Sequence, residues 1–348
     1  MIKVLVVEDS PAVREFLVHV LSADSDILVV GTAHDGEQAL EAVRRLAPDV
    51  ITMDIHMPRL DGIEATRRIM ENDPVPIVIV SGSSDPKEVA TTFRAMAAGA
   101  LAVLPRPAGI GHPEHEASSR ELVRTVKLMS EIRVVRRWPR TRQELPPSPE
   151  PRLPDPAPAR LRAVAIGAST GGPPALQSLL AALPKDFPAP ILIVQHMAAG
   201  FIQGFADWLA QSAKIPVHLA NHGETLLPGH VYVAPDGVQM KVGRGDRIVL
   251  ASDPPDQGLR PSVAALFRSL AEVYGGEVAV CLLTGMGRDG AEELKLLRDQ
   301  GATTFVQDEA SSVVHGMPGA AIRLDAASFV LPPEKMAAAL SSLAGKRK

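Results

Sequence analysis

The feature that most constrains this 348-residue chain is a proline-rich stretch that contains eight prolines between Pro139 and Pro158. Proline fixes φ and lacks a backbone N–H, so this stretch can form neither a helix nor a central strand. We expect an extended, semi-rigid linker between two separately folded segments. The predicted domains are residues 1–125 and 161–345, and residues 126–160 hold the end of a last helix and the linker.

The first segment alternates short apolar runs with amphipathic helical patterns. The apolar runs predict strands at residues 3–7, 28–30, 50–53, 77–80 and 101–104. Helices are predicted at residues 11–21, 37–46 and 62–71, and a last helix at 121–135. Regular alternation of strand and helix predicts an α/β fold with a doubly wound parallel sheet.

The second segment repeats this alternation. Strands are predicted at residues 164–166, 190–196, 217–219, 231–233, 240–242, 247–250, 278–283 and 303–306. Helices are predicted at residues 175–183, 200–212, 261–274 and 291–300. A second doubly wound parallel-sheet domain is therefore expected after the linker.

Composition excludes several classes of protein. The net charge of −4 gives no reason to expect nucleic-acid binding. No run reaches the ~18 apolar residues of a membrane span, and the N-terminus lacks a signal peptide's apolar core. We expect a cytoplasmic protein without membrane insertion. The single cysteine, Cys281, lies in an apolar run and is predicted to be a buried core thiol.

Acidic side chains follow two of the strands predicted in the first segment. Glu8 and Asp9 follow residues 3–7, and Asp54 follows residues 50–53. Because the carboxyl ends of parallel strands open into one crevice, these carboxylates are expected to lie close together. Clustered carboxylates of this kind suit Mg²⁺. Ser81 ends the fourth strand in the same way.

A small-residue turn, Gly-Ala-Ser-Thr-Gly-Gly at 167–172, joins a predicted strand to a predicted helix. Three interpretations of this turn remain open. It matches the Gly-x-Ser-x-Gly pattern of a nucleophile elbow, it resembles a phosphate-binding turn without either nucleotide fingerprint, or it is purely structural. The N–H groups of the helix start would lie beside Ser169, where they can stabilise developing negative charge.

Ser169, His196 and Asp289 each follow the carboxyl end of a predicted parallel strand, so all three can meet in one crevice. A serine nucleophile needs a base, histidine titrates near neutrality, and a carboxylate fixes its tautomer. The alternative bases are His218, His222, His230 and His315, and the alternative acids are Asp236 and Asp308. The order Ser, His, Asp differs from that of α/β-hydrolases.

The first 125 residues resemble a two-component receiver domain, which has a flavodoxin-like fold. The motifs that carry this resemblance are Val-Val-Glu-Asp-Ser at 6–10, Thr-Met-Asp-Ile-His-Met-Pro at 52–58, Val-Ser at 80–81 and Arg-Pro at 106–107. The resemblance implies that Asp54 accepts a phosphoryl group from a histidine kinase, with Mg²⁺ on Glu8, Asp9 and Asp54. It makes Ser81 and Arg106 the switch residues. Arg106 replaces the family's usual lysine, Val103 its usual aromatic residue, and His56 a frequent glutamate.

Residues 161–345 resemble the protein-glutamate methylesterase domain of bacterial chemotaxis, the CheB family. The motifs that carry this resemblance are residues 167–172, Gln-His-Met at 195–197, Gly-Phe at 200–201, Ala-Pro at 234–235, Arg-Pro-Ser at 260–262, Leu-Thr-Gly-Met-Gly-Arg-Asp-Gly at 283–290 and Gly-Met-Pro at 316–318. The resemblance implies a Rossmann-like domain. Gln239 stands where the family often has histidine.

The same resemblance implies a serine esterase that demethylates glutamate methyl esters on methyl-accepting chemoreceptors, releases methanol and also deamidates receptor glutamines. Ser169 would be the nucleophile, His196 the base and Asp289 the group that orients it, with no cofactor for hydrolysis. N–H groups near Met286 and the 169–172 turn would stabilise the oxyanion, and Thr170 would help to place His196. The alternative function is a phosphorylation-dependent binding module with a degenerate esterase domain.

Overall fold

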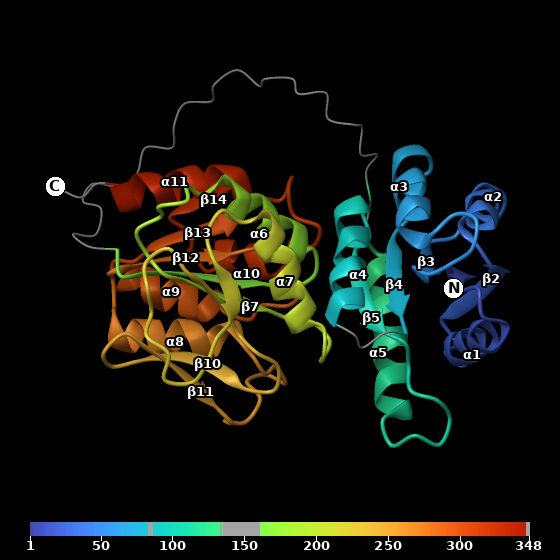
Figure 1. Ribbon diagram of the computed structural model, residues 1–348, viewed down its shortest axis with the longest axis horizontal. Coiled ribbons are helices and arrows are strands. Elements are labelled where there is room, and N and C mark those ends of the chain that lie inside the picture. The colour runs from blue at the N-terminus through green and yellow to red at the C-terminus, as the bar shows by residue number, and fades with distance from the viewer. Residues whose placement is uncertain (83–85, 133, 135–160, 346–348) are drawn as a thin grey trace. The chain divides into compact units, whose positions relative to one another are not determined.

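The computed structural model describes residues 1–82, 86–132, 134 and 161–345 (Figure 1). Side chains are described over the same ranges except for residues 86–91. The chain divides into two compact units, residues 1–146 and 147–348. The predicted proline-rich linker lies outside the described residues.

The first unit is a five-stranded parallel sheet with the order β2-β1-β3-β4-β5. Its strands are β1 (Ile2–Val7), β2 (Ile27–Ala33), β3 (Val50–Met53), β4 (Ile77–Ser81) and β5 (Ala102–Pro105). Its helices are α1 (Pro11–Ser22), α2 (Gly36–Leu46), α3 (Gly62–Asn72), α4 (Pro86–Ala98) and α5 (His115–Ser130). Helices α1 and α5 pack together, while α2, α3 and α4 pack in sequence, as expected of a doubly wound sheet.

The prediction for the last helix of this unit was wrong at both ends, since α5 begins at His115 rather than Glu121 and ends at Ser130. The serines before Glu121 suggest a turn, but in α5 the Ser118 hydroxyl donates a 2.7 Å hydrogen bond to the carbonyl oxygen of Glu114. A serine that bonds one turn back in this way is compatible with a helix.

The second unit contains a seven-stranded parallel sheet with the order β14-β13-β12-β6-β7-β9-β8. Its strands are β6 (Ala163–Ala168), β7 (Ile191–Gln195), β8 (Val217–Leu219), β9 (Val231–Val233), β12 (Val278–Leu282), β13 (Thr303–Gln307) and β14 (Phe329–Leu331). A separate antiparallel hairpin joins β10 (Gln239–Gly243) to β11 (Arg247–Ala251). The predicted α/β fold with two doubly wound parallel sheets is confirmed.

Within residues 161–345, six helices cover this sheet: α6 (Gly172–Ala182), α7 (Ile202–Ser212), α8 (Val263–Val273), α9 (Ala291–Asp299), α10 (Gly316–Arg323) and α11 (Pro333–Gly345). Helices α6, α7 and α11 pack together, as do α8, α9 and α10, and Figure 1 shows α11 and α8 on opposite sides of the sheet. The hairpin packs on α8. Strand β6 lies between β12 and β7, so the ends of these three strands are adjacent at the sheet edge where the predicted site residues lie.

Two differences from the prediction concern the second unit. Helix α8 begins at Val263 rather than Pro261, because Ser262 is its N-cap and accepts a 3.1 Å hydrogen bond from the N–H of Ala265. Elements α10, β14 and α11 were not predicted. The first residues of α10 are Gly-Met-Pro-Gly, which on sequence alone is typical of a loop.

Candidate functional site

Ser169 lies directly after β6, on the turn that leads into α6. Its N–H donates a 3.0 Å hydrogen bond to the carbonyl oxygen of Thr284, after β12. Its own carbonyl oxygen accepts a 2.8 Å bond from the N–H of Gly172, the first residue of α6. These bonds fix the backbone of Ser169 between the ends of two parallel strands, while its side chain remains half-buried.

The structure brings His196 and Asp289 together from neighbouring parts of the same sheet edge. The Nε2 atom of His196 lies 2.9 Å from Oδ2 of Asp289, and the two side chains are 12% and 4% exposed. The contact is close but is not aligned as a hydrogen bond, because Nε2 has no partner of suitable geometry. Contacts of this kind are often poorly aligned without substrate and tighten when substrate binds.

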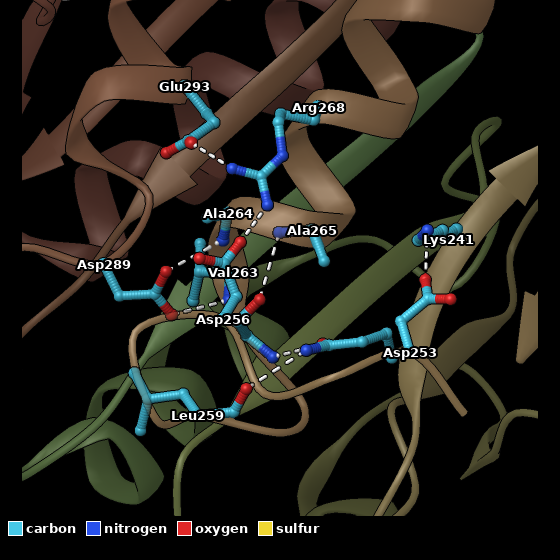
Figure 2. A network of polar contacts seen from close by, with 12 residues as sticks. Lys241, Asp253, Asp256, Leu259, Val263, Ala264, Ala265, Arg268, Asp289 and Glu293 are labelled. Atoms are coloured by element: carbon cyan, nitrogen blue, oxygen red, sulfur yellow. Dashed lines mark hydrogen bonds and ion pairs between the residues drawn. The ribbon is translucent and has the colours of Figure 1, made fainter. Parts of the chain in front are cut away.

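Asp289 is held by the first turn of α8. Its Oδ2 accepts a 2.7 Å hydrogen bond from the N–H of Val263, and its Oδ1 accepts a 3.0 Å bond from the N–H of Ala264 (Figure 2). Both bonds are buried. The N–H groups at a helix start lack intrahelical partners and carry partial positive charge, so they stabilise an ionised carboxylate. Asp289 is therefore fixed in the orientation that reaches His196.

Gln195 is a buried side chain whose role the sequence analysis missed. Its Nε2 lies 2.8 Å from the carbonyl oxygens of both Ser169 and His196, and donates to both. Its Oε1 is buried without a hydrogen-bond partner among the described residues. A Cβ atom on Gly172 would lie 2.1 Å from Oε1, so any larger residue there would displace this amide. The one signal in the sequence was a polar residue at the end of a buried strand.

The loop after β12 packs directly on Ser169. A Cβ atom on Gly285 would lie 2.7 Å from Cβ of Ser169, so a side chain at this position would force Ser169 or the loop to shift. Thr284 is fully buried and its Oγ1 lies 2.9 Å from the carbonyl oxygen of Thr170. That bond holds the main chain of Thr170, and the role of Thr170 in placing His196 stays a prediction.

The N–H groups of the predicted oxyanion site fall into two sets. Those of Ser169 and Gly172 already donate to carbonyl oxygens. Those of Thr170, Gly171 and Met286 donate to no other backbone group within the described parts of the chain. These three N–H groups are accordingly the ones available to a ligand near Ser169.

The alternative bases lie elsewhere or have other contacts. His218 lies 2.8 Å from a carboxylate oxygen of Glu224, and His230 stacks on Tyr232 with ring centroids 6.2 Å apart. Nδ1 of His222 accepts a 3.2 Å bond from the N–H of Leu250. His315 alone lies beside the site, since it pairs with Gly285 through an isolated bridge.

The alternative acids also have other roles. Oδ2 of Asp236 accepts a 2.8 Å bond from the N–H of Gly200, which fixes the loop after His196. Oδ1 of Asp308 accepts a 3.1 Å bond from the N–H of Ser311. Neither of these bonds involves His196, whereas Asp289 contacts its ring.

In the first unit, the carboxylates of Glu8, Asp9 and Asp54 gather at the ends of β1 and β3, where their oxygens lie within 4.8 Å of one another. Burial is the main cause that raises the pKa of Glu8 to about 7, and repulsion from Asp54 adds to it. Burial also raises the pKa of Asp54. A cluster of acids whose ionised forms are destabilised in this way fits a divalent cation with oxygen ligands.

Arg106 supplies positive charge to this cluster. Its Nη2 lies 3.1 Å from Oε2 and 3.4 Å from Oε1 of Glu8. Its N–H also donates a 2.8 Å bond to the carbonyl oxygen of Ser81, which is 2% exposed at the end of β4. The structure thus pairs Arg106 with Glu8 of the acidic cluster and bonds its main chain to that of Ser81.

Comparison with known proteins assigns both units. The profile described as CheB methylesterase matches residues 164–340, and the profile described as response regulator receiver domain matches residues 4–112. The chain belongs to the CheB methylesterase family. Ser169, His196 and Asp289 lie within the CheB methylesterase match, and Glu8, Asp9, Asp54, Ser81 and Arg106 lie within the receiver match.

Similar proteins of the CheB family span the whole chain. A protein of Nitrosospira multiformis named protein-glutamate methylesterase/protein-glutamine glutaminase is 62% identical over 100% of this chain and 98% of its own length. A protein of Geobacter metallireducens with the same name and the number 4 is 58% identical over 99% of each chain. The crystal structure of the Thermotoga maritima CheB methylesterase catalytic domain is 35% identical, with a TM-score of 0.51, over 52% of this chain and 98% of that domain.

Among the described residues, no helix combines the length and the apolar character needed to cross a bilayer.

Proposed function

We propose that this chain is a protein-glutamate methylesterase that acts on methyl-accepting chemoreceptors and also deamidates their glutamines. The observation that carries the proposal is the contact between His196 and Asp289, whose carboxylate is fixed by two N–H groups of α8. This pair lies at the sheet edge where Ser169 follows β6. The names of the relatives support the substrate class.

The reaction begins when the hydroxyl oxygen of Ser169 attacks the carbonyl carbon of the γ-glutamyl ester. Because Nε2 of His196 faces Asp289, Nδ1 is the nitrogen that accepts the serine proton. Asp289 stabilises the imidazolium that forms. The proton then passes to the leaving methoxide, methanol departs, and an acyl-enzyme remains. Water, activated by His196, hydrolyses it to the glutamate side chain and restores Ser169.

Deamidation follows the same steps with a glutamine side chain as substrate. The C–N bond of the amide breaks instead of the C–O bond of the ester, and ammonia leaves in place of methanol. In both reactions the oxygen of the tetrahedral intermediate becomes negatively charged. The N–H groups of Thr170, Gly171 and Met286 are the donors that would stabilise it.

The receiver unit would control this activity. Asp54 would accept a phosphoryl group from a histidine kinase, and Glu8, Asp9 and Asp54 would hold Mg²⁺. When bound, Mg²⁺ neutralises the negative charge of these carboxylates and of the phosphoryl oxygens. Ser81 and Arg106 would respond to the loaded site, and Arg106 must leave Glu8 to do so.

The test uses full-length protein and a methylated chemoreceptor, with methanol release as the readout. We expect Ser169→Ala, His196→Ala and Asp289→Ala each to lower the rate by at least about a thousand-fold, with combinations no worse than the worst single change. Retention of more than about a tenth of the rate by Ser169→Ala would exclude Ser169 as the nucleophile. Normal receptor binding without hydrolysis by the unchanged protein would favour the binding-module alternative.

A further inference from the structure

Four successive N–H groups at the start of α8 donate hydrogen bonds to side chains. Oε1 of Gln239 accepts from Ser262 at 2.8 Å, the carboxylate of Asp289 accepts from the next two N–H groups, and the hydroxyl of Ser262 accepts from Ala265. All of these bonds are buried. Two of these four acceptors belong to the site described above, and one belongs to the hairpin strand β10.

Gln239 uses both ends of its amide. While Oε1 accepts from Ser262, Nε2 donates a 3.1 Å hydrogen bond to the carbonyl oxygen of Leu259. The side chain is 1% exposed. A primary amide supplies a donor and an acceptor together at every pH, which a carboxylate or an apolar side chain does not. Gln239 therefore fixes both sides of the short segment that enters α8.

Two ion pairs formed by Arg268 also connect the segments around the start of α8. Arg268 of α8 pairs with Asp256 in the preceding loop and, at 2.8 Å, with Glu293 of α9 (Figure 2). Asp256 and Leu259 bond to each other through both backbone N–H groups. The carbonyl oxygen of Leu259 thus accepts from the loop and from Gln239. The loop, the hairpin and both helices next to Asp289 form one connected set of polar contacts.

We propose that Gln239 is a positioning residue for hydrolysis, which acts through the first turn of α8 on Asp289 and through Asp289 on His196. The proposal rests on the proposed function, since it requires Asp289 to orient the base. Ser262 directly precedes Val263 and Ala264, the two donors to Asp289. A shift of Ser262 therefore moves both donors. A misplacement of about 1 Å in a catalytic group can cost about a hundred-fold in rate.

The experiment measures kcat and KM of the full-length protein with a chromogenic activated ester. We expect Gln239→Leu to lower kcat by about 10- to 100-fold and to change KM by less than about three-fold. In an Asp289→Ala background the same change should cost less than about two-fold, because there is no carboxylate left to misplace. An equal loss in both backgrounds would overturn the proposal.

Ser269→Ala is the matched control. Ser269 is also buried, and its hydroxyl accepts a 2.9 Å bond from the N–H of Val242, so it joins the same hairpin to the same helix away from Asp289. We expect this variant to lose stability and to keep kcat. A kcat loss equal to that of Gln239→Leu would show that any weakening of the hairpin contact suffices, and would overturn the specific role.

Gln239→Glu provides a second, nearly isosteric variant. A protonated carboxyl can donate to Leu259 and accept from Ser262, whereas an ionised one cannot donate. The ratio of its kcat to that of the unchanged protein should therefore fall as the pH rises from 6 to 9. A ratio that does not fall contradicts the proposal.

If Ser169→Ala retains activity, the proposed function fails; if Ser169→Ala is inactive and Gln239→Leu is not impaired, only the positioning role fails.

Discussion

Nε2 of Gln195 lies 2.8 Å from the carbonyl oxygen of Ser169, and the same atom also reaches the carbonyl oxygen of His196. One buried amide thus sets the separation between the backbones of the proposed nucleophile and the proposed base. Both partners of this amide are main-chain oxygens, so these two hydrogen bonds do not involve the side chains that are proposed to react.

We predict that Gln195→Leu lowers kcat for methanol release by about 10- to 100-fold, because the spacing of Ser169 and His196 is no longer fixed. The change also removes two part-buried hydrogen bonds, which destabilises the fold by about 1–2 kcal/mol. Steady-state kinetics and thermal unfolding measure the two effects. Gln203→Leu, an exposed glutamine on α7, is the control and should alter neither. Unchanged kcat for Gln195→Leu would contradict this prediction.

Gly285→Ala is expected to slow the enzyme by crowding Ser169. The added Cβ would lie 2.7 Å from Cβ of Ser169 and 2.4 Å from Sδ of Met317, so the serine or the loop must move. We expect a loss of at least about ten-fold in kcat from the displaced nucleophile. Gly345→Ala, where a Cβ meets nothing within 4 Å, is the matched control and should be neutral. Equal activity of the two variants would show that the serine tolerates the contact.

Binding of Mg²⁺ to the receiver unit should depend on pH between 6 and 8. Burial raises the pKa of Glu8 from its ordinary 4.5 to about 7. Below pH 4.5 Glu8 is protonated in both the folded and the unfolded state. As the pH rises from 4.5 through 7, the free energy of unfolding decreases, because the folded state disfavours the ionised carboxylate. Mg²⁺ needs the ionised form, so the affinity should increase about ten-fold from pH 6 to pH 8. Calorimetry in buffers of different ionisation enthalpy counts the protons released.

Glu8→Gln is the control for this titration. Without an ionisable group at position 8, the affinity should be weaker and the increase with pH should be much smaller. Equal affinity of the unchanged protein at pH 6 and pH 8 would contradict the assignment of Glu8 as the titrating ligand.

The response to phosphorylation should be limited by Arg106. Its Nη2 contacts both carboxylate oxygens of Glu8, and a lysine ammonium differs from the guanidinium in its reach and in the geometry of its donors. We predict that Arg106→Lys increases the stimulation of methanol release by a small-molecule phosphodonor. Asp54→Asn is the control and should abolish stimulation in either background. If Arg106→Lys leaves the stimulation unchanged, the pairing with Glu8 does not limit the switch.

Cys281 should be inert in the folded protein. It is fully buried in β12, and burial raises the pKa of its thiol far above the ordinary value. Reaction with a thiol-disulfide reagent at pH 8 should be at least about a hundred-fold slower in native buffer than in denaturant. Cys281→Ala should show no reaction in either condition and should retain methanol release. Rapid labelling of the native protein would contradict the buried position.

The predicted sheets could be read from the sequence because buried parallel strands are short apolar runs, as at residues 50–53 and 278–282. The approach of His196 to Asp289 followed from strand ends that meet in one crevice. Their placement required only the order of elements and the rule for parallel sheets. Local sequence patterns were therefore sufficient to predict the two sheets and the approach of His196 to Asp289.

The supporting amides could not be predicted in the same way. Gln195 and Gln239 are single polar residues, and their partners lie as far as 26 positions away along the chain. Which carbonyl or N–H a buried amide meets is decided by tertiary packing, and no periodic pattern encodes it. The same holds for α10, where tertiary contacts stabilise a helix that begins with glycine and proline.

The parallel pairing of β6 with β12 has a consequence for biosynthesis. The hydroxyl of Thr284 reaches the carbonyl oxygen of Thr170 across 114 positions of sequence, and β6 has no neighbour on that side until β12 has been made. A nascent chain on the ribosome therefore carries Ser169 and His196 long before the strand that brings Asp289. Such non-local pairing folds late. Under the proposed mechanism, the unit can gain esterase activity only after β12 and the loop that carries Asp289 have left the ribosome.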